Sequence, residues 1–263
     1  MTLPDISAPA PDRLRDDWLH WREHRTAELA DPTGWLSLTA LHWLSPVPAP
    51  AGDLPGLWWA DTDGIQVLLD GDPLTLDGHE LTGRATVWAP STGPAGDLRH
   101  GDRRLEPLAR GPLSHGVRVR DPHAPALTAF TGVPVFDHDP AWRLTGAFTP
   151  AAAGERAETG SVALGVRHVQ DVEGTLTLHH DGADHTLLVT GGGLVSFRDA
   201  TNGRQTAAFR VLTVHPDPDG TVVVDLNWAR NAPCAFSDHG TCPLPPAGNT
   251  LPFAVTAGER APR

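Results

Sequence analysis

The sequence predicts a mainly β protein, in which an N-terminal helix is followed by two antiparallel β lobes, sandwich or barrel-like, and an irregular Pro-rich C-terminal tail. Three observations lead to this class. Gly (27) and Pro (26) make up about a fifth of the 263 residues, against roughly 12% in average usage, which favours many short strands joined by turns. Turn dipeptides such as Asp77-Gly78 and Asp181-Gly182 separate β-prone runs. Only the N-terminal part has a sustained helical repeat.

The helix is expected between residues 12 and 30. Its inward face recurs at about the helical period, and Asp12 can act as its N-cap. The pair Asp31-Pro32 ends it, because the residue before a proline is pushed out of the helical region. The residues of the expected inward face are Leu14, Trp18, Trp21, Arg25 and Leu29.

The expected strands alternate apolar and polar residues and are bounded by Gly, Asn and Asp. The chain is expected to divide into a helical segment (1–32), a first β lobe (33–112) and a second β lobe with the tail (113–263). One continuous domain is the alternative. Segment 35–44 is apolar and compatible with a strand or a short helix. The other expected strands are 64–69, 74–76, 79–88, 98–108, 117–120, 142–148, 162–170, 175–179, 186–190, 194–197, 206–214 and 221–227.

Charge and composition exclude several classes of function. The formal net charge is −12 and no basic cluster is present, so we expect neither nucleic acid nor an anionic membrane as a partner. The absence of lysine and tyrosine excludes Schiff-base chemistry and a Walker-type phosphate loop. No secretory signal or apolar run of membrane-spanning length is present, so we expect a cytoplasmic protein. No cofactor is predicted.

The C-terminal part carries the most specific motifs. These are DLNWARNAPCAF (225–236), TCPLPPAGNTL (241–251) and AGE (257–259). Earlier blocks are GWLSLTALHWL (34–44), HGVRVRD (115–121), FTG (130–132) and FRDATNG (197–203). In this order they resemble a bacterial family of unknown function, DUF1684, over nearly the whole chain. The resemblance implies no established activity.

The chain departs from the family pattern at two places. Where the family usually has Thr-Tyr after Asn202-Gly203, the sequence has Thr206-Ala207. Where the family usually has a tyrosine in the Asn-rich segment, Arg230 stands. Family chemistry that needs those hydroxyl groups is therefore not expected here.

The first candidate site lies at the end of the last expected strand. Alternation places Asp225 and Asn227 on one face of that strand, and Asn231 and Asn249 follow in the tail. These side chains can bind a polar ligand. They can equally satisfy the irregular backbone of the tail, and we favour this structural interpretation because buried backbone groups must be hydrogen-bonded.

Two arginines form the second candidate. Arg118 and Arg120 share one strand face, opposite Val117 and Val119, and two guanidinium groups can grip a carboxylate or a phosphate. A lattice of ion pairs on a solvated face is the alternative. The sharper hypothesis is that Arg118 or Arg120 meets Asp225 or Glu259 inside the fold.

The cysteines are the third candidate. Cys234 and Cys242 are separated by a short Pro-flanked segment that also contains His239. We rank a disulfide or a close reducible thiol pair first, a zinc site second and nucleophilic catalysis third. His20 and His24 fit the H-x-x-E-H pattern of inverted zinc proteases, but the context of that motif is missing, so no metal is predicted.

Two functional hypotheses follow. One is a binding protein whose cleft is lined by Arg118, Arg120, Asp225, Asn227 and Asn231 and takes a small polar or anionic molecule. The other is a hydrolase that uses the same cleft, with Asp225 or Glu259 as general base. A purely structural role is the third alternative.

Overall fold

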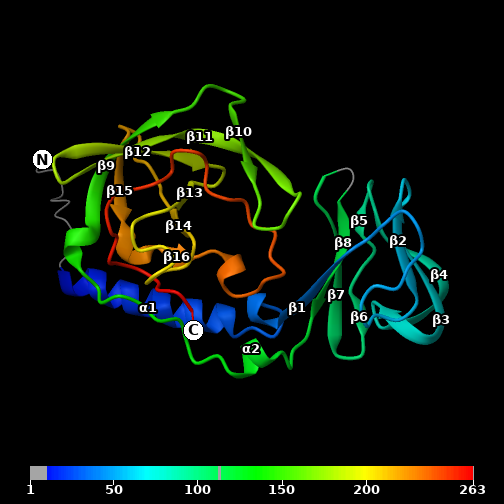
Figure 1. The fold of residues 1–263 in the computed structure, drawn as a ribbon. Coiled ribbons are helices and arrows are strands. Elements are labelled where there is room, and N and C mark those ends of the chain that lie inside the picture. Colours follow the sequence, from blue (N-terminus) through cyan, green and yellow to red (C-terminus); the bar gives the residue numbers. More distant parts are fainter. Residues whose placement is uncertain (1–10, 112–113, 263) are drawn as a thin grey trace, which may run out of the picture.

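The fold was obtained as a computed structural model, which describes residues 11–111 and 114–262. Two antiparallel sheets and an N-terminal helix make up a mainly β protein, as expected. Figure 1 shows the second sheet curling over α1 and the C-terminal segment, with the first sheet beyond the end of α1. The second sheet is a half-barrel.

Helix α1 (Pro11–Leu29) carries the predicted inward face. Trp18, Arg25 and Leu29 are buried, and Leu14 and Trp21 are half-buried. The prediction of Asp12 as N-cap is wrong, because the helix already begins at Pro11 and Asp12 lies within its first turn. The short helices that follow along the chain are η1 (Trp35–Ser37), α2 (Pro125–Thr128), η2 (Pro140–Trp142), η3 (Leu226–Trp228) and η4 (Pro233–Ala235).

The first sheet has the strand order β1-β8-β7-β6-β3-β4-β5, with β2 paired to β3. Its core contains Trp58, Ile65, Val67, Leu74, Leu98, Leu105, Val117 and Val119, among others. The strands are β1 (Leu38–Trp43), β2 (Leu57–Asp61), β3 (Gly64–Leu76), β4 (His79–Ala89), β5 (Gly93–Pro94), β6 (Leu98–His100), β7 (Arg103–Ala109) and β8 (His115–Arg120).

The second sheet has the order β15-β9-β11-β12-β13-β14-β16, with β10 paired to β11. It encloses a separate core that includes Leu176, Leu178, Val189, Phe197, Val222, Val224 and Leu251. The strands are β9 (Arg143–Pro150), β10 (Arg156–Gly160), β11 (Arg167–His180), β12 (Ala183–Thr190), β13 (Leu194–Phe197), β14 (Arg210–Thr213), β15 (Thr221–Asp225) and β16 (Arg230–Asn231).

Two predicted hairpin turns have the backbone that their residues favour. Asp77 and Gly78 both have positive φ, 50° and 80°, between β3 and β4. Asp181 and Gly182, at 51° and 76°, connect β11 and β12 in the same way. Positive φ at both central residues matches the right-handed twist of the flanking strands.

The first sheet extends further along the chain than the expected lobe, which ends at residue 112. Strand β8 pairs with β1 and β7, so this sheet reaches Arg120. The physical reason is that β7 and β8, neighbours in the sequence, pair antiparallel in one sheet.

The last expected strand is shorter than the sequence indicates. Strand β15 ends at Asp225, whose carboxylate accepts a hydrogen bond from the backbone N–H of Asn227 and caps η3. Asn227 therefore does not lie on the strand face that Asp225 occupies. The chain forms this cap and does not continue the alternating strand, because the cap satisfies a backbone N–H group at the strand end.

Candidate functional site

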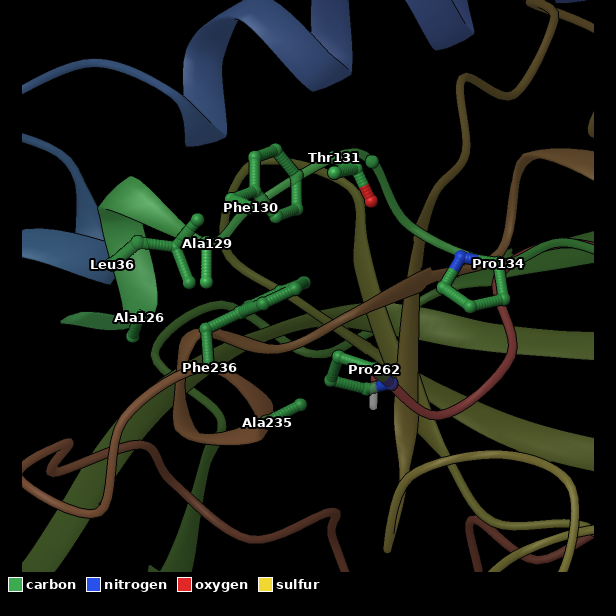
Figure 2. A pocket seen from close by; sticks show the side chains of 10 residues that line it. Leu36, Ala126, Ala129, Phe130, Thr131, Pro134, Ala235, Phe236 and Pro262 are labelled. Atoms are coloured by element: carbon green, nitrogen blue, oxygen red, sulfur yellow. The ribbon is translucent and has the colours of Figure 1, made fainter.

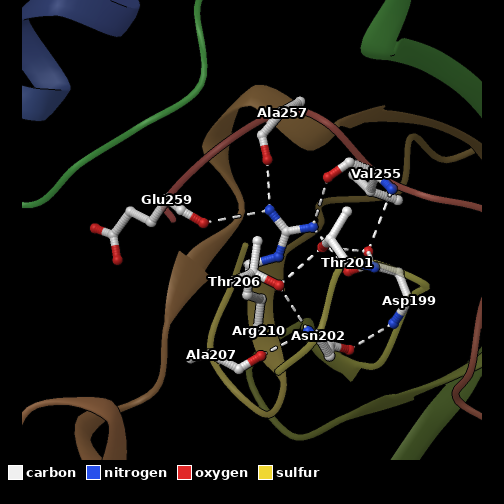
Figure 3. A network of polar contacts seen from close by, with 9 residues as sticks. All are labelled: Asp199, Thr201, Asn202, Thr206, Ala207, Arg210, Val255, Ala257 and Glu259. Atoms are coloured by element: carbon white, nitrogen blue, oxygen red, sulfur yellow. Dashed lines mark hydrogen bonds and ion pairs between the residues drawn. The ribbon is translucent and has the colours of Figure 1, made fainter. Parts of the chain in front are cut away.

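Most polar residues of the C-terminal motifs bind backbone groups. Arg210 shows this most clearly, because its side chain and that of Asp199 are fully buried and form an ion pair at 2.8 Å. The guanidinium also donates to the carbonyl oxygens of Val255, Ala257 and Glu259. Figure 3 shows the guanidinium enclosed between the C-terminal segment and the loop that carries Asp199.

Asn227 and Asn231 have similar roles. Asn227 is fully buried, receives the backbone N–H of Asp139 and donates to the carbonyl of Asp139 and the carboxylate of Asp225. Asn231 donates through Nδ2 to the carbonyl of Arg260. Its Oδ1 is buried without a hydrogen-bond partner among the described residues.

Asn249 replaces part of a strand ladder. Its Oδ1 accepts the N–H of Leu188, and its Nδ2 donates to the carbonyls of Leu188 and Ser196. It thereby bridges β12 and β13, which pair directly only through Thr190 and Leu194. These contacts agree with the structural interpretation, in which the asparagines satisfy backbone groups around the irregular tail.

The two arginines do not meet the two candidate carboxylates, so the hypothesis of that pairing is wrong. Arg118 and Arg120 belong to β8 of the first sheet, whereas Asp225 ends β15 of the second. Asp225 instead faces Arg143, with 3.5 Å between Nη1 and Oδ2, because β9 and β15 are paired neighbours. Glu259 pairs with Arg25 of α1 at 3.0 Å.

Both candidate general bases have their oxygens engaged. Glu259 is buried, its Oε1 accepts from Arg25, and its Oε2 accepts the backbone N–H of Asn231 at 2.6 Å. Asp225 accepts twice from Asn227 through Oδ1 and faces Arg143 through Oδ2. Neither arrangement leaves a carboxylate oxygen directed at a substrate, so the geometry does not favour the hydrolase.

Arg118 and Arg120 share a face, as predicted, and their guanidinium carbons each lie 5.3 Å from the ring centroid of Trp35. Arg120 donates to Glu106 at 2.8 Å. Arg118 donates to the hydroxyl of Thr241 at 3.1 Å, and its Nε is buried without a partner among the described residues. This face therefore meets η1 and the C-terminal segment, where the two sheets join.

One predicted residue, Asp225, lines a polar cavity of about 480 Å³. Strand β15 begins the strand order of the second sheet, and β14 stands near its other end. Because both strands line the cavity, the cavity lies at the opening of the half-barrel. Trp21 of α1 and Trp228 of η3 close it, with ring centroids 5.1 Å apart. Its polar residues are Arg143, Thr213, His215, Asp225 and Arg230.

Arg230 is the unusual member of this wall. It takes part in none of the ion pairs found within residues 11–111 and 114–262. Burial lowers the pKa of its guanidinium, the positive charge of Arg25 lowers it further, and Glu28 and Glu259 act in the opposite direction. An arginine nevertheless stays protonated in proteins, so a half-buried positive charge faces this cavity without a direct counterion.

A smaller cavity of about 240 Å³ lies on the other side of Arg230. Its wall combines apolar and polar residues from α1, η1, β13, β14, β16 and the C-terminal segment. The residues that matter for chemistry are Arg25, Ser196, Arg230, Asn231 and Cys242.

The two cysteines are brought together in this region. Both are free thiols and half-buried, they pack against the same apolar cluster, and they lie close enough for a hydrogen bond between them to shift both pKa values. That bond from Cys234, with the nearby charges of Arg118 and Arg110, lowers the pKa of Cys242 to about 7 against the effect of burial. The same hydrogen bond and burial raise the pKa of Cys234.

A third cavity, of about 500 Å³, has mostly apolar side chains in its wall. Figure 2 shows Phe130 and Phe236 on opposite sides of it, with Leu36 at one end and Pro134 and Pro262 at the other. Thr131 supplies its one side-chain polar group. This cavity offers no titratable or nucleophilic side chain and is not a candidate for catalysis.

No group of three potential metal ligands is found in the described part of the chain, and His20 and His24 are exposed on α1. Within the same residues, no helix has both the length and the apolar character needed to span a membrane.

Sequence reasoning missed Arg143, His215 and Arg110. Arg143 lies 82 residues from Asp225 along the chain, and only the pairing of β9 with β15 brings them together. No local pattern encodes that pairing. Arg230 was visible as a departure from the family pattern, but it was not predicted as a site residue.

Comparison with known proteins places this half-barrel in a class of uncharacterised β domains. The profile of the family described as "Protein of unknown function (DUF1684)" matches residues 128–260, a range that contains every strand of the second sheet. The chain belongs to this family, as the motifs indicated, although the match covers residues 128–260 and not nearly the whole chain.

A solution NMR structure of an uncharacterized protein of Haloarcula marismortui is similar to part of the chain. The two are 33% identical, the match covers 51% of this chain and 78% of that chain, and the TM-score is 0.42. No curated protein matches the sequence.

Proposed function

We propose that the protein binds a small anionic molecule in the polar cavity that fills the opening of the half-barrel. The observation that carries this proposal is Arg230, a half-buried guanidinium that lines the cavity and has no ion-pair partner in the described part of the chain. A partly desolvated charge without a counterion is unfavourable. An anionic ligand would supply that counterion.

The charges of the wall support an anion rather than a cation. Arg143 and Arg230 contribute two positive charges against the one carboxylate of Asp225, which Asn227 and Arg143 already engage. His215 adds a further donor. A guanidinium can grip a carboxylate or a phosphate through two parallel hydrogen bonds.

The apolar residues of the same wall favour a ligand with a flat or hydrocarbon portion. Trp21, Trp228, Leu212 and Val223 line the cavity beside the arginines. Ligand sites commonly combine a mostly apolar wall with a few polar groups that fix orientation. We therefore infer a small carboxylate with an aromatic or aliphatic part as the ligand class.

Calorimetric titration and thermal shift with benzoate test the proposal, with inorganic phosphate and neutral benzamide as comparison probes. We expect benzoate to bind and to raise the melting temperature, and benzamide to do neither. Arg230→Gln should weaken benzoate binding by about 1.5–3 kcal/mol, the usual range for a hydrogen bond to a charged group. That range corresponds to roughly ten- to hundredfold in Kd.

Arg156→Gln is the matched control, because Arg156 is exposed and lies on β10, away from the cavity wall. It should leave benzoate binding unchanged. Equal binding of benzoate and benzamide, or unchanged binding to Arg230→Gln, contradicts the proposal. The melting temperature of each free variant shows whether the substitution has disturbed the fold.

A further inference from the structure

We propose that Cys242 and Cys234 form a redox-active dithiol, which a small carboxylate-bearing disulfide oxidises in the cavity beside Arg230. Cys242 is the attacking residue and lines this cavity of about 240 Å³. Cys234 lines a different cavity but packs against the same apolar cluster as Cys242, formed by Phe209, Val211 and Ala232, so it is placed to resolve the mixed disulfide. This inference concerns another cavity than the proposed anion site, although Arg230 lines both.

The surroundings of Cys242 favour the thiolate, which is the reactive form of cysteine. Its neighbour in sequence, Thr241, accepts hydrogen bonds from both Arg110 (3.0 Å) and Arg118 (3.1 Å) through one hydroxyl oxygen. Two guanidinium groups are thereby held next to the residue that precedes Cys242. The Nε of Arg118 is buried and lacks a partner among the described residues, so this charge is not fully engaged by protein groups.

The two cysteines differ in pKa in the way expected of an attacking thiol and a resolving thiol. The pKa of Cys242 is lowered to about 7, whereas the pKa of Cys234 is raised by its hydrogen bond to Cys242 and by burial. Near neutral pH about half of the pairs therefore hold one thiolate and one thiol. In such a pair the thiolate of Cys242 is the nucleophile, and the thiol of Cys234 holds a proton that the leaving group can take up.

The cavity favours a negatively charged disulfide. Arg230 lies in its wall without an ion-pair partner among the described residues, whereas Arg25 is paired with Glu28 and Glu259. The positive groups Arg118 and Arg110 stand near Cys242. Ser196 and the unpartnered Oδ1 of Asn231 add polar groups in the same wall of the described structure. Trp35 and Phe209 provide apolar surface for a short hydrocarbon chain.

The reaction balances as a two-electron exchange. The thiolate of Cys242 attacks one sulfur of R–S–S–R, forms a mixed disulfide and releases RS⁻. Cys234 then loses its proton to this released thiolate and attacks the Cys242 sulfur, which releases the second RS⁻. The products are one intramolecular disulfide, one RSH and one RS⁻, so the small disulfide is reduced and the protein dithiol is oxidised.

The test uses the reduced full-length chain with three disulfides of similar size and different charge: dithiodipropionate (anionic), bis(2-hydroxyethyl) disulfide (neutral) and cystamine (cationic). Stopped-flow kinetics and intact-protein mass spectrometry follow the reaction. We expect the anionic disulfide to react fastest and the cationic one slowest. The product of the unsubstituted protein should be an intramolecular disulfide without an added group.

Two cysteine variants assign the roles. Cys234→Ser should accumulate the mixed disulfide at Cys242, whereas Cys242→Ser should react about tenfold slower, because Cys234 lines a different cavity and no arginine in the described part of the chain lowers its pKa. Reaction at similar rates in both variants overturns the assignment of Cys242. Equal rates for the three disulfides overturn the anionic class of substrate.

A pH profile separates a reactive thiolate from a merely exposed thiol. The rate of the Cys234→Ser variant should rise with a midpoint below the usual cysteine value of about 8.5, and Arg118→Met should move that midpoint upward. An unshifted midpoint in both proteins contradicts the proposal. The anion site is tested separately with benzoate and Arg230→Gln, so either idea can fail while the other holds.

Discussion

Arg210 shows how a single residue ties the C-terminal segment to the half-barrel. Its guanidinium meets one buried carboxylate and three backbone carbonyls, all within the core of the second sheet. Burial lowers the pKa of Arg210, and the charge of Asp199 opposes that effect. The carbonyls belong to a segment without regular strands, so the arginine satisfies acceptors that no sheet ladder reaches.

Removing one partner of this pair should be strongly destabilising. Asp199→Asn leaves the buried guanidinium without its countercharge, and the expected loss of unfolding free energy is about 3–5 kcal/mol. Urea denaturation at neutral pH measures it. The matched control is Asp171→Asn, which breaks the exposed pair with Arg156 and should cost no more than about 1 kcal/mol. Equal losses in the two variants would show that the buried network does not hold the tail.

At the scale of elements, the C-terminal segment completes the second sheet. Strands β12 and β13 share only one direct pair, Thr190 with Leu194. Asn249 fills the gap between them with three hydrogen bonds to Leu188 and Ser196. A side chain from a distant, irregular segment thus takes the place of strand pairing.

Asn249→Ala should open this part of the sheet. One buried and two half-buried backbone groups would lose their partners, at roughly 1–3 kcal/mol for a fully buried group, so a loss of about 2–4 kcal/mol is expected. Hydrogen exchange should show faster exchange of the Leu188 amide, while amides of the β3–β4 hairpin in the first sheet stay protected.

The comparison variant for this prediction is Asn202→Ala, because the contacts of Asn202 remain within the loop before β14. It should leave the exchange of the Leu188 amide unchanged. Unchanged protection of Leu188 in Asn249→Ala contradicts a bridging role for Asn249.

At the scale of the whole molecule, two histidines lie where the sheets and the C-terminal segment meet. His42 of β1 faces Asp53 and His239, and His168 of β11 faces Arg110 and Thr241. Burial is the main cause that lowers the pKa of both histidines. The Nε2 atoms of both rings are buried without partners among the described residues.

These lowered pKa values predict that acidification destabilises the fold. In the unfolded chain the histidines take up protons near their ordinary pKa of about 6.5, whereas the folded state resists protonation until the pH is lower. Their contribution is therefore present above about pH 6.5 and is lost as pH falls through the folded pKa values. Urea unfolding at about pH 7.5 and about pH 5.5 should show lower stability at the acidic pH.

The variant His42→Asn/His168→Asn should lose part of this pH dependence. His123 and its ion-pair partner Asp102 are both exposed, so His123→Asn provides the control variant. If the control reduces the pH dependence as much as the double variant does, the buried histidines are not its source.

The sequence predicted the fold class and several local elements. The face of α1, the turns at Asp77-Gly78 and Asp181-Gly182, and the common face of Arg118 and Arg120 are present in the structure. Each depends on periodicity or on the backbone preference of a few neighbouring residues. The family could be recognised from motif order in the same way.

The candidate sites were predicted only in part. Asp225 lines the polar cavity and the two cysteines are in contact, but the predicted meeting of Arg118 or Arg120 with Asp225 is wrong. Strand alternation specifies which side chains share a face. It does not specify which sheet a strand joins, because that depends on pairing partners far away in the sequence.

The sequence by itself determined the local structure: the helix, the hairpin turns, the alternating strands and the irregular tail. Only the tertiary structure decided that β8 joins the first sheet, that Arg143 faces Asp225, and that Arg230, among the described residues, is left without a direct counterion beside two cavities. Local preferences act over a few residues, whereas the identity of a buried charge's partner depends on how the whole chain closes around it.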